Sequence, residues 1–159
     1  MIRRVSRILR CEVTCLFLLL SVNQARHLIP AIELIAGADT VLWDIDAHCY
    51  TESNIWQLLK MGRSFLVKYP SMSDILVTKI MLGVFGNVPA FDSNFKKGFR
   101  VATFGPKALR KIGAFYEEHR MVIDRYQTPT LDFVSGKTTS RKYTRCKVID
   151  MAFFIEGMS

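Results

Sequence analysis

Three short segments of the sequence carry side chains whose types and spacing could do chemistry. The first, residues 43–48, reads Trp-Asp-Ile-Asp-Ala-His. In an extended segment Asp44, Asp46 and His48 point to one face, where two carboxylates and an imidazole could hold a divalent metal ion or exchange protons. On a helix the three side chains splay apart. No further acid or histidine is placed to complete a metal shell, so we favour turn and capping roles for the aspartates and expect no metal site.

The second segment, residues 136–139, reads Gly-Lys-Thr-Thr and ends like a phosphate-binding P-loop. The pattern G-x-x-x-x-G-K-S/T requires glycine where Leu131 stands, so we exclude a nucleotide-binding P-loop. What remains is a polar segment with one aromatic among its cations. Such cations could hold backbone phosphates while the ring stacks on a base or sugar, although a solvated surface accounts for the same residues. The residues concerned are Lys137, Arg141, Lys142, Tyr143, Arg145 and Lys147.

Positive charge is unevenly distributed along the chain of 159 residues. The sequence has 22 Lys and Arg against 14 Asp and Glu, a net charge of +8. Residues 94–147 hold 13 Lys and Arg against four Asp and Glu, whereas residues 11–93 hold five against eight. This asymmetry predicts a side that faces a polyanion. Our leading hypothesis is a helical binding or interaction protein that meets nucleic acid or another polyanion through residues 137–147 together with Lys96, Lys97 and Arg100.

The third segment leads up to Asp92. Residues 78–95 read TKIMLGVFGNVPAFDSNF, a pattern of helix, glycine-relaxed turn, proline-stiffened extension and Asp-Ser helix start. This run resembles one shared by an uncharacterised helical family of bacterial proteins, and the likeness extends from about Trp43 to the C-terminus. More distantly, residues 85–93 are similar to the stretch of helix-hairpin-helix DNA glycosylases that ends in their catalytic aspartate. That resemblance implies that Asp92 is a catalytic acid at the mouth of a cleft that receives an extruded base.

A plainer role for Asp92 is open on the same residues. Aspartate is among the best helix N-cap residues, and Asp92 stands directly before a short helix predicted to run toward Phe99. The glycosylase hairpin carries a Gly-x-Gly that binds DNA phosphate, whereas residues 69–73 contain no glycine. Lys79 also stands fewer residues before Asp92 than the hairpin lysine of that family does before its aspartate. A base-excision enzyme that uses Asp92 is therefore our alternative to a binding protein.

Hydrophobic periodicity predicts that helices position these segments. Apolar residues recur at helical spacing, with matching start and stop signals, over residues 27–36, 51–68, 73–82, 92–99, 106–123 and 143–156. Pro30 is expected in a first turn, and Gly37 and Gly157 at helix ends. Residues 128–140 form a predicted loop with at most a short strand at 131–134, and the alternating residues 41–48 are too isolated to build a sheet. We therefore predict an all-α fold of five to seven helices around one core.

The N-terminal segment, residues 1–24, combines a basic start with an apolar run. We interpret it as an amphipathic first helix, with a secretory signal over residues 1–25 as the alternative. Residues 25–159 then form a single helical domain. The apolar run is too short to span a membrane, so we predict no membrane span and a cytoplasmic protein unless that segment directs export.

Composition and cysteine spacing exclude several classes of protein. A chain that is 50% hydrophobic and 23% charged is neither collagen-like nor wholly disordered. Its cysteines form no CxxC pair and match neither a zinc site nor a disulfide framework. We expect buried reduced thiols and no cofactor. The four cysteines are Cys11, Cys15, Cys49 and Cys146.

Overall fold

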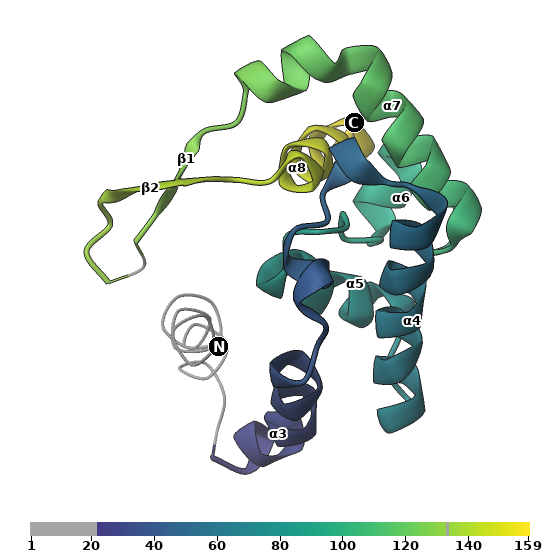
Figure 1. Ribbon diagram of the computed structural model, residues 1–159, viewed down its shortest axis with the longest axis vertical. Helices are drawn as coiled ribbons and strands as arrows, with labels where there is room; N and C mark the ends of the chain where they lie inside the picture. The colour runs from purple at the N-terminus through teal and green to yellow at the C-terminus, as the bar shows by residue number, and fades with distance from the viewer. Residues whose placement is uncertain (1–21, 133) are drawn as a thin grey trace.

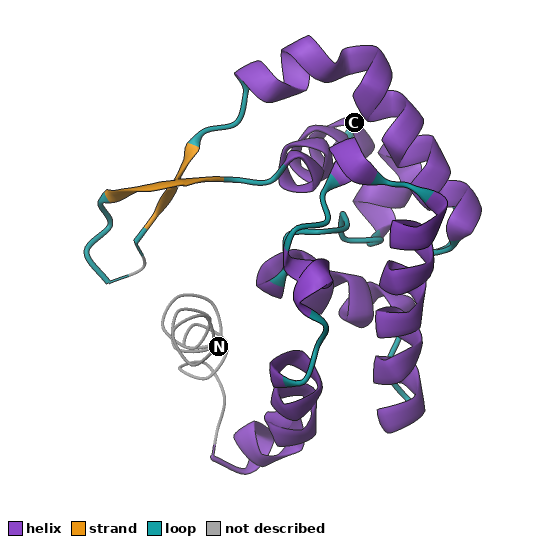
Figure 2. Cartoon of the chain, in the orientation of Figure 1, coloured by secondary structure: helices purple, strands orange, loops and turns teal. Residues whose placement is uncertain are grey.

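The computed structural model describes residues 22–132 and 134–159, in which helices make up nearly all of the regular structure (Figures 1 and 2). The prediction of a mostly helical fold with five to seven helices is confirmed for these residues, whereas the predicted first helix lies largely outside them. The α-helices are α3 (Val22–Ala36), α4 (Glu52–Lys68), α5 (Asp74–Val84), α6 (Ser93–Phe99), α7 (Pro106–Arg125) and α8 (Arg145–Met158). Two short 3-10 helices, η1 (Thr40–Trp43) and η2 (Ala47–Cys49), and two strands, β1 (Pro129–Leu131) and β2 (Thr138–Lys142), complete the described elements.

Local side-chain caps begin most of these helices where the sequence predicted them. The hydroxyls of Thr51 and Ser73 accept hydrogen bonds from backbone N–H groups in the first turns of α4 and α5. Thr144 does the same for α8. Each such cap contributes about 1 kcal/mol because it satisfies a donor that the helix itself leaves unpaired. Helix α7 instead begins at Gly105-Pro106, with proline at a position that needs no N–H.

Two local predictions about glycine and proline positions need correction. Pro30 lies inside α3 and not in its first turn, since the helix already begins at Val22. Gly157 lies within α8, where a Cβ would overlap the carbonyl oxygen of Asn94. A Cβ on Gly98 of α6 would likewise overlap the carbonyl oxygen of Phe153. These glycines let α6 and α8 approach each other closely, a requirement of packing that the sequence pattern presents as a helix stop.

The core is shared by all the larger helices. Fully buried side chains include Leu58 and Phe65 of α4, Met81 of α5, Leu109 of α7 and Ile149 of α8. Aromatic rings fill the region where α6, α7 and α8 meet, with stacked and edge-on contacts among Phe95, Phe99, Phe115 and Phe153. Such ring pairs add to the stabilisation that their buried area provides. Within the described residues, no helix is both long enough and apolar enough to cross a membrane.

The end of α7 directs the chain away from this core. The helix bends at His119, whose backbone angles are not helical and whose ring nitrogen Nδ1 lies 3.1 Å from the Phe115 carbonyl oxygen. Beyond the bend, β1 and β2 form an antiparallel hairpin that extends to one side of the helices (Figure 1). The predicted short strand at 131–134 is thus replaced by a strand on either side of the turn.

Candidate nucleic-acid interface

The projecting hairpin, residues 129–142, is held in shape by its own polar contacts. Pro129 lies opposite Lys142 and Leu131 opposite Thr138, with an irregularity in the register between these pairs. The hydroxyls of Thr130 and Thr139 are hydrogen-bonded across the strands at 2.6 Å. A two-stranded ribbon without a packed face is only marginally stable on its own, so these cross-strand contacts and its attachment to the helices define its position.

The carboxylate in the turn of the hairpin accepts hydrogen bonds from the turn itself. Asp132 Oδ1 accepts hydrogen bonds from the backbone N–H and the hydroxyl of Ser135, both at 2.8 Å. The Ser135 N–H and hydroxyl hold the pKa of Asp132 below its ordinary value. Gly136 adopts a φ of 65°, which favours glycine, and Lys137 follows it into β2. The Gly-Lys-Thr-Thr sequence therefore leads from the hairpin turn into β2.

Three cations of the hairpin have no carboxylate partner. Lys137, Arg141 and Lys142 are exposed, and none of them forms an ion pair with any residue that the structure describes. Arg141 and Lys142 are consecutive in β2, where the pairing with β1 is irregular. The hairpin therefore carries unneutralised positive charge in β2 and at its turn.

The base of the hairpin is fixed to the end of α7. The Tyr143 N–H donates to the Thr128 carbonyl oxygen at 3.0 Å, and the Gln127 side-chain amide donates to the Tyr143 carbonyl oxygen at 3.0 Å. Tyr143 is half-buried, so only part of its ring is available to a ligand. Arg125 and Tyr126, which end α7 and are exposed, lie beside this base. Neither residue was predicted to bind nucleic acid, because in the sequence both have the pattern of a polar helix end.

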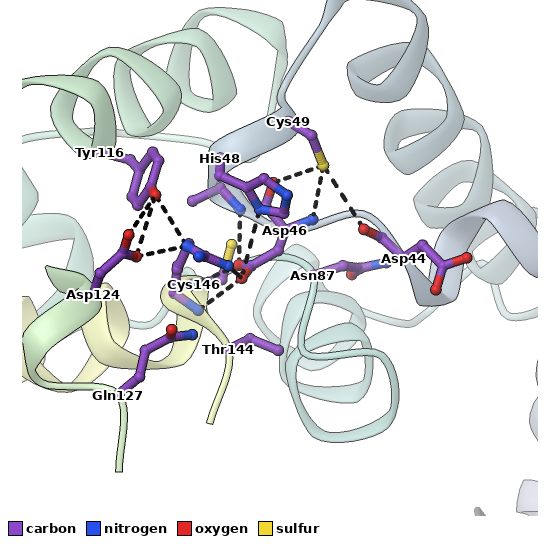
Figure 3. A network of polar contacts seen from close by, with 12 residues as sticks. Asp44, Asp46, His48, Cys49, Asn87, Tyr116, Asp124, Gln127, Thr144 and Cys146 are labelled. Carbon is purple, nitrogen blue, oxygen red and sulfur yellow. Dashed lines mark hydrogen bonds and ion pairs between the residues drawn. The ribbon is translucent and has the colours of Figure 1, made fainter. Parts of the chain in front are cut away.

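Arg145, also predicted to bind phosphate, instead contacts Asp124 and Tyr116, two members of the polar network that Figure 3 labels. Its Nε donates to Asp124 Oδ1 at 2.7 Å and to the Tyr116 hydroxyl at 3.0 Å. Its Nη1 lies 3.5 Å from Asp46 Oδ2. Lys147 is likewise paired, with its Nζ 3.2 Å from Asp150 Oδ2. These two cations neutralise internal carboxylates and leave little charge for a phosphate.

Asp46 is the buried carboxylate at the centre of this network. Its Oδ1 accepts hydrogen bonds from the N–H groups of Ala47 at 2.7 Å and Cys146 at 2.9 Å, and its Oδ2 accepts from the Arg145 N–H at 2.9 Å. One carboxylate therefore caps both η2 and the distant start of α8, where the helix dipole also favours negative charge. A turn or capping role was predicted for this aspartate, but neither η2 nor its contact with the distant start of α8 was predicted.

The segment with Asp44, Asp46 and His48 does not adopt the extended conformation that would align the three side chains. Residues 41–48 form η1, a linking stretch and the start of η2, so Asp44 and Asp46 do not share an extended face. Asp44 is exposed, and His48 Nδ1 lies 4.0 Å from Asp46 Oδ2. Among the described residues, no group of three or more His, Cys, Asp or Glu side chains could hold a metal ion.

The two described cysteines are free thiols, as predicted. Cys146 is buried, and its Sγ lies 3.1 Å from the Tyr50 hydroxyl, which donates to the Asn87 carbonyl oxygen at 2.6 Å. Burial raises the pKa of the Cys146 thiol and that of the Tyr50 hydroxyl well above their ordinary values. Both groups are neutral near pH 7, and Cys146 is therefore no nucleophile. Cys49 is half-buried, while Cys11 and Cys15 lie outside the described residues.

Asp92 has the geometry of a helix N-cap residue, which is the plainer of its two predicted roles. Its Oδ1 accepts a hydrogen bond from the Phe95 N–H at 3.0 Å, and its Oδ2 lies 3.8 Å from Lys79 Nζ. Two grooves in the described part of the chain are lined by α3, α4, η1 and the link before η1, and Asp92 lines neither of them. The N-cap role is confirmed, and the catalytic role of Asp92 stays a prediction that only the glycosylase resemblance supports.

The remaining basic residues of the prediction lie on and directly after α6, away from the hairpin. Lys96 and Lys97 belong to α6, and Arg100 is its C-cap residue with a φ of 55°. Close packing of Gly98 on Phe153 places α6 against the C-terminal half of α8, whereas the hairpin joins the N-terminal end of that helix. Arg145 and Phe153 are eight positions apart, about 12 Å along a helix. The fold thus separates the two predicted groups.

Comparisons with protein-family models, with curated proteins and with solved structures find no match to this chain. The resemblances to a bacterial helical family and to DNA glycosylases therefore stay predictions. The hairpin is the feature that indicates a function.

Proposed function

We propose that this protein binds nucleic acid by placing the projecting hairpin in a groove of the double helix. The observation that carries this proposal is the hairpin itself, a two-stranded ribbon outside the helical body with three cations that no carboxylate of the described chain neutralises. A major groove admits a two-stranded β-ribbon, and several DNA-binding proteins use one in this way. Cytoplasmic nucleic acid is the partner that best suits such a surface.

The distribution of charge on the ribbon supports this docking mode. Arg141 and Lys142 are adjacent and exposed in β2, so a ribbon lying in a groove would bring both cations close to its phosphate walls. Lys137 adds charge at the turn, and Arg125 adds charge where the ribbon leaves α7. Contacts of this kind go mainly to phosphates and fix orientation more than base sequence. We therefore expect binding with weak sequence preference.

Salt dependence of binding tests the proposal. Anisotropy of a labelled duplex of about 20 base pairs should show log K falling with log salt at a slope of about −3, since each neutralised phosphate contributes roughly 0.9. The double variant Arg141→Ala/Lys142→Ala should flatten that slope by about 2 because two contacts are lost. A single-stranded oligonucleotide of the same length should bind less tightly than the duplex if the groove is the target.

A matched double variant locates the interface. Lys96→Ala/Lys97→Ala removes the same charge from α6 and should leave the slope unchanged. An equal flattening by both variants would move the interface to the whole basic surface and contradict docking by the hairpin. If the wild-type protein does not retain the duplex even at about 25 mM salt, where such contacts are strongest, nucleic-acid binding is refuted.

A further inference from the structure

Helix α4 presents an apolar and basic stripe to solvent on the side away from the core. Four of its residues recur at intervals of three to four positions, so they lie along one line of the helix. They are Trp56, Lys60, Arg63 and Val67. Trp56 is 60% exposed and Val67 is 82% exposed, although both are large apolar side chains. The two residues are eleven positions apart, which spans about 16 Å along the helix axis. Single exposed hydrophobic residues are ordinary, but an aligned set beside a groove indicates an interaction surface.

A shallow groove runs beside this stripe, between α4 and α3. Its volume of about 530 Å³ has room for several side chains. Figure 1 shows α3 next to the lower part of α4, apart from α8 and the hairpin. No carboxylate lines the groove within the described residues. The lining residues are Leu34, Trp56, Leu59, Lys60, Arg63, Ser64, Val67 and Lys68.

The cations of this groove are available to a partner. Lys60, Arg63 and Lys68 form no ion pair with any described residue. Lys60 Nζ lies 5.2 Å above the centre of the Trp56 ring, so the ammonium group partly covers the indole in the free protein. That contact is exposed and worth little, and a ligand could displace it at small cost. The groove thus combines an apolar floor with a rim whose charged side chains are all positive.

Charge and shape together favour one class of occupant. A second copy of this chain would place Lys60, Arg63 and Lys68 against the same cations, which is unfavourable in a symmetric interface. A nucleic acid would satisfy the cations, but Trp56 is the one ring of the lining that could stack on a base, and the aliphatic Leu34, Leu59 and Val67 would stay unpaired. An amphipathic helix with acidic residues beside its apolar face satisfies both parts of the groove.

We propose that the α3–α4 groove is a docking site for an acidic amphipathic helix of another protein. The apolar anchors of that helix, spaced at i, i+3 or i+4, and i+7, fill the floor between Trp56 and Val67. Its Asp and Glu residues pair with Lys60, Arg63 and Lys68 at the rim. This surface is separate from the hairpin, so the protein can hold a nucleic acid and a protein partner at the same time.

The probe is a labelled synthetic peptide of about 18 residues with a stripe of Leu between flanking Glu residues, compared with a peptide of identical composition in scrambled order. The striped peptide should bind with a dissociation constant below about 100 μM and shift the fluorescence of the exposed Trp56. The scrambled peptide should bind at least about tenfold more weakly. Equal binding of the two peptides would reduce the effect to bulk charge and overturn the proposal, as would no binding of the striped peptide.

Matched variants test whether the striped peptide binds in the α3–α4 groove. Val67→Glu should weaken binding of the striped peptide at least about tenfold, whereas Met121→Glu, at an exposed position of α7, should not. Arg63→Glu should also weaken it about tenfold, whereas Arg125→Glu, with the same change of charge, should have little effect. If the control variants weaken binding as much as the groove variants, the peptide does not occupy this groove.

Two other occupants give different outcomes, each of which overturns the proposal. An oligonucleotide that competes with the peptide and shifts Trp56 fluorescence would make the groove a nucleic-acid site. A dimer in sedimentation velocity that Val67→Glu dissociates would make it a self-interface. Failure of duplex binding by the hairpin leaves the peptide result unaffected, because the two experiments use different probes and different variants.

Discussion

The cations of β2 and those at the start of α8 differ in what surrounds them, although they are neighbours in the sequence. Arg141 and Lys142 are exposed and meet no carboxylate of the described chain. Arg145 contacts Asp46 and Asp124, and Lys147 contacts Asp150. A basic cluster in a sequence therefore does not define a basic surface. Carboxylates brought in by the fold decide which of its members remain available to a polyanion.

This difference also separates the two regions in energetic terms. Asp46 is buried and receives three backbone N–H groups as well as the Arg145 guanidinium. Such a carboxylate tolerates burial only because each of these donors compensates for lost hydration. The charges of β2 stay hydrated and contribute little to folding. The first region should thus govern stability and the second should govern binding.

The largest expected effect follows from removing the central carboxylate. Asp46→Ala leaves the N–H groups of Ala47, Arg145 and Cys146 without their acceptor and leaves the guanidinium of Arg145 poorly compensated. We expect a loss of about 3–5 kcal/mol in the free energy of unfolding, the range for breaking a buried ion pair on one side. Urea denaturation followed by circular dichroism measures it.

Asp39→Ala is the matched control for this variant. Asp39 also accepts a backbone N–H at the start of a 3-10 helix, but that contact is local and exposed. Its removal should cost roughly 1 kcal/mol or less, as for a simple cap. If both variants lost the same stability, the cross-chain role of Asp46 would have no energetic basis.

A smaller loss of stability is expected when the positive charge at position 145 is kept and the shape of the side chain is changed. Arg145→Lys retains the positive charge but cannot place one planar group against Asp124 and the Tyr116 hydroxyl together. We expect a loss of about 1–2 kcal/mol in the free energy of unfolding, the worth of a charge-assisted hydrogen bond. Thermal and urea denaturation measure the change.

Lys142→Arg makes the reverse exchange on the hairpin and should leave stability nearly unchanged. In duplex binding, neither variant should alter the salt slope, because each keeps its charge and Arg145 does not face the ligand. A flatter slope for Arg145→Lys would place Arg145 in the interface and remove the contrast between the two regions.

The sequence predicts those features that depend on neighbouring residues. The caps at Thr51, Ser73 and Asp92 each act within their own first turn, so their residue types and positions were sufficient. The proline start of α7 was predictable for the same reason. The hairpin was only partly predicted, because short polar strands have no hydrophobic alternation to mark them.

Features that depend on distant residues could not be obtained in this way. Asp46 caps α8 through hydrogen bonds to Arg145 and Cys146, 99 and 100 positions away in the chain. Gly157 has the sequence pattern of a helix stop, but the proximity of Asn94 in α6 explains its lack of a side chain. The fate of Arg145 was hidden for the same reason, since Asp46 and Asp124 reach it only through the tertiary fold, whereas the partner of Lys147 stands three residues further along α8.

The smallest expected effect concerns the pH dependence of the Lys147–Asp150 pair. Burial raises the pKa of Asp150 above its ordinary value, against the opposing effects of Lys147 and of the hydrogen bond from the Ala90 N–H, and the negative charge of Asp92 adds to the rise. The folded protein therefore holds this proton more tightly than the unfolded chain does. Over the pH range between the two pKa values, the contribution of Asp150 to stability must fall as pH rises.

Asp150→Asn isolates this contribution, because the amide has no proton to lose in that range and can still accept from the Ala90 N–H. We expect the free energy of unfolding of the wild type, minus that of Asp150→Asn, to decrease from about pH 4 upward and to level off above the raised pKa. Urea denaturation at several pH values gives the difference at each point, and titrations shared by both proteins, such as those of Glu52 and Asp132, cancel. A difference that grows with pH would mean that attraction to Lys147 outweighs burial. Lys147 would then stabilise an ionised Asp150 as Arg145 does Asp46, and the two cations would differ only in their degree of exposure.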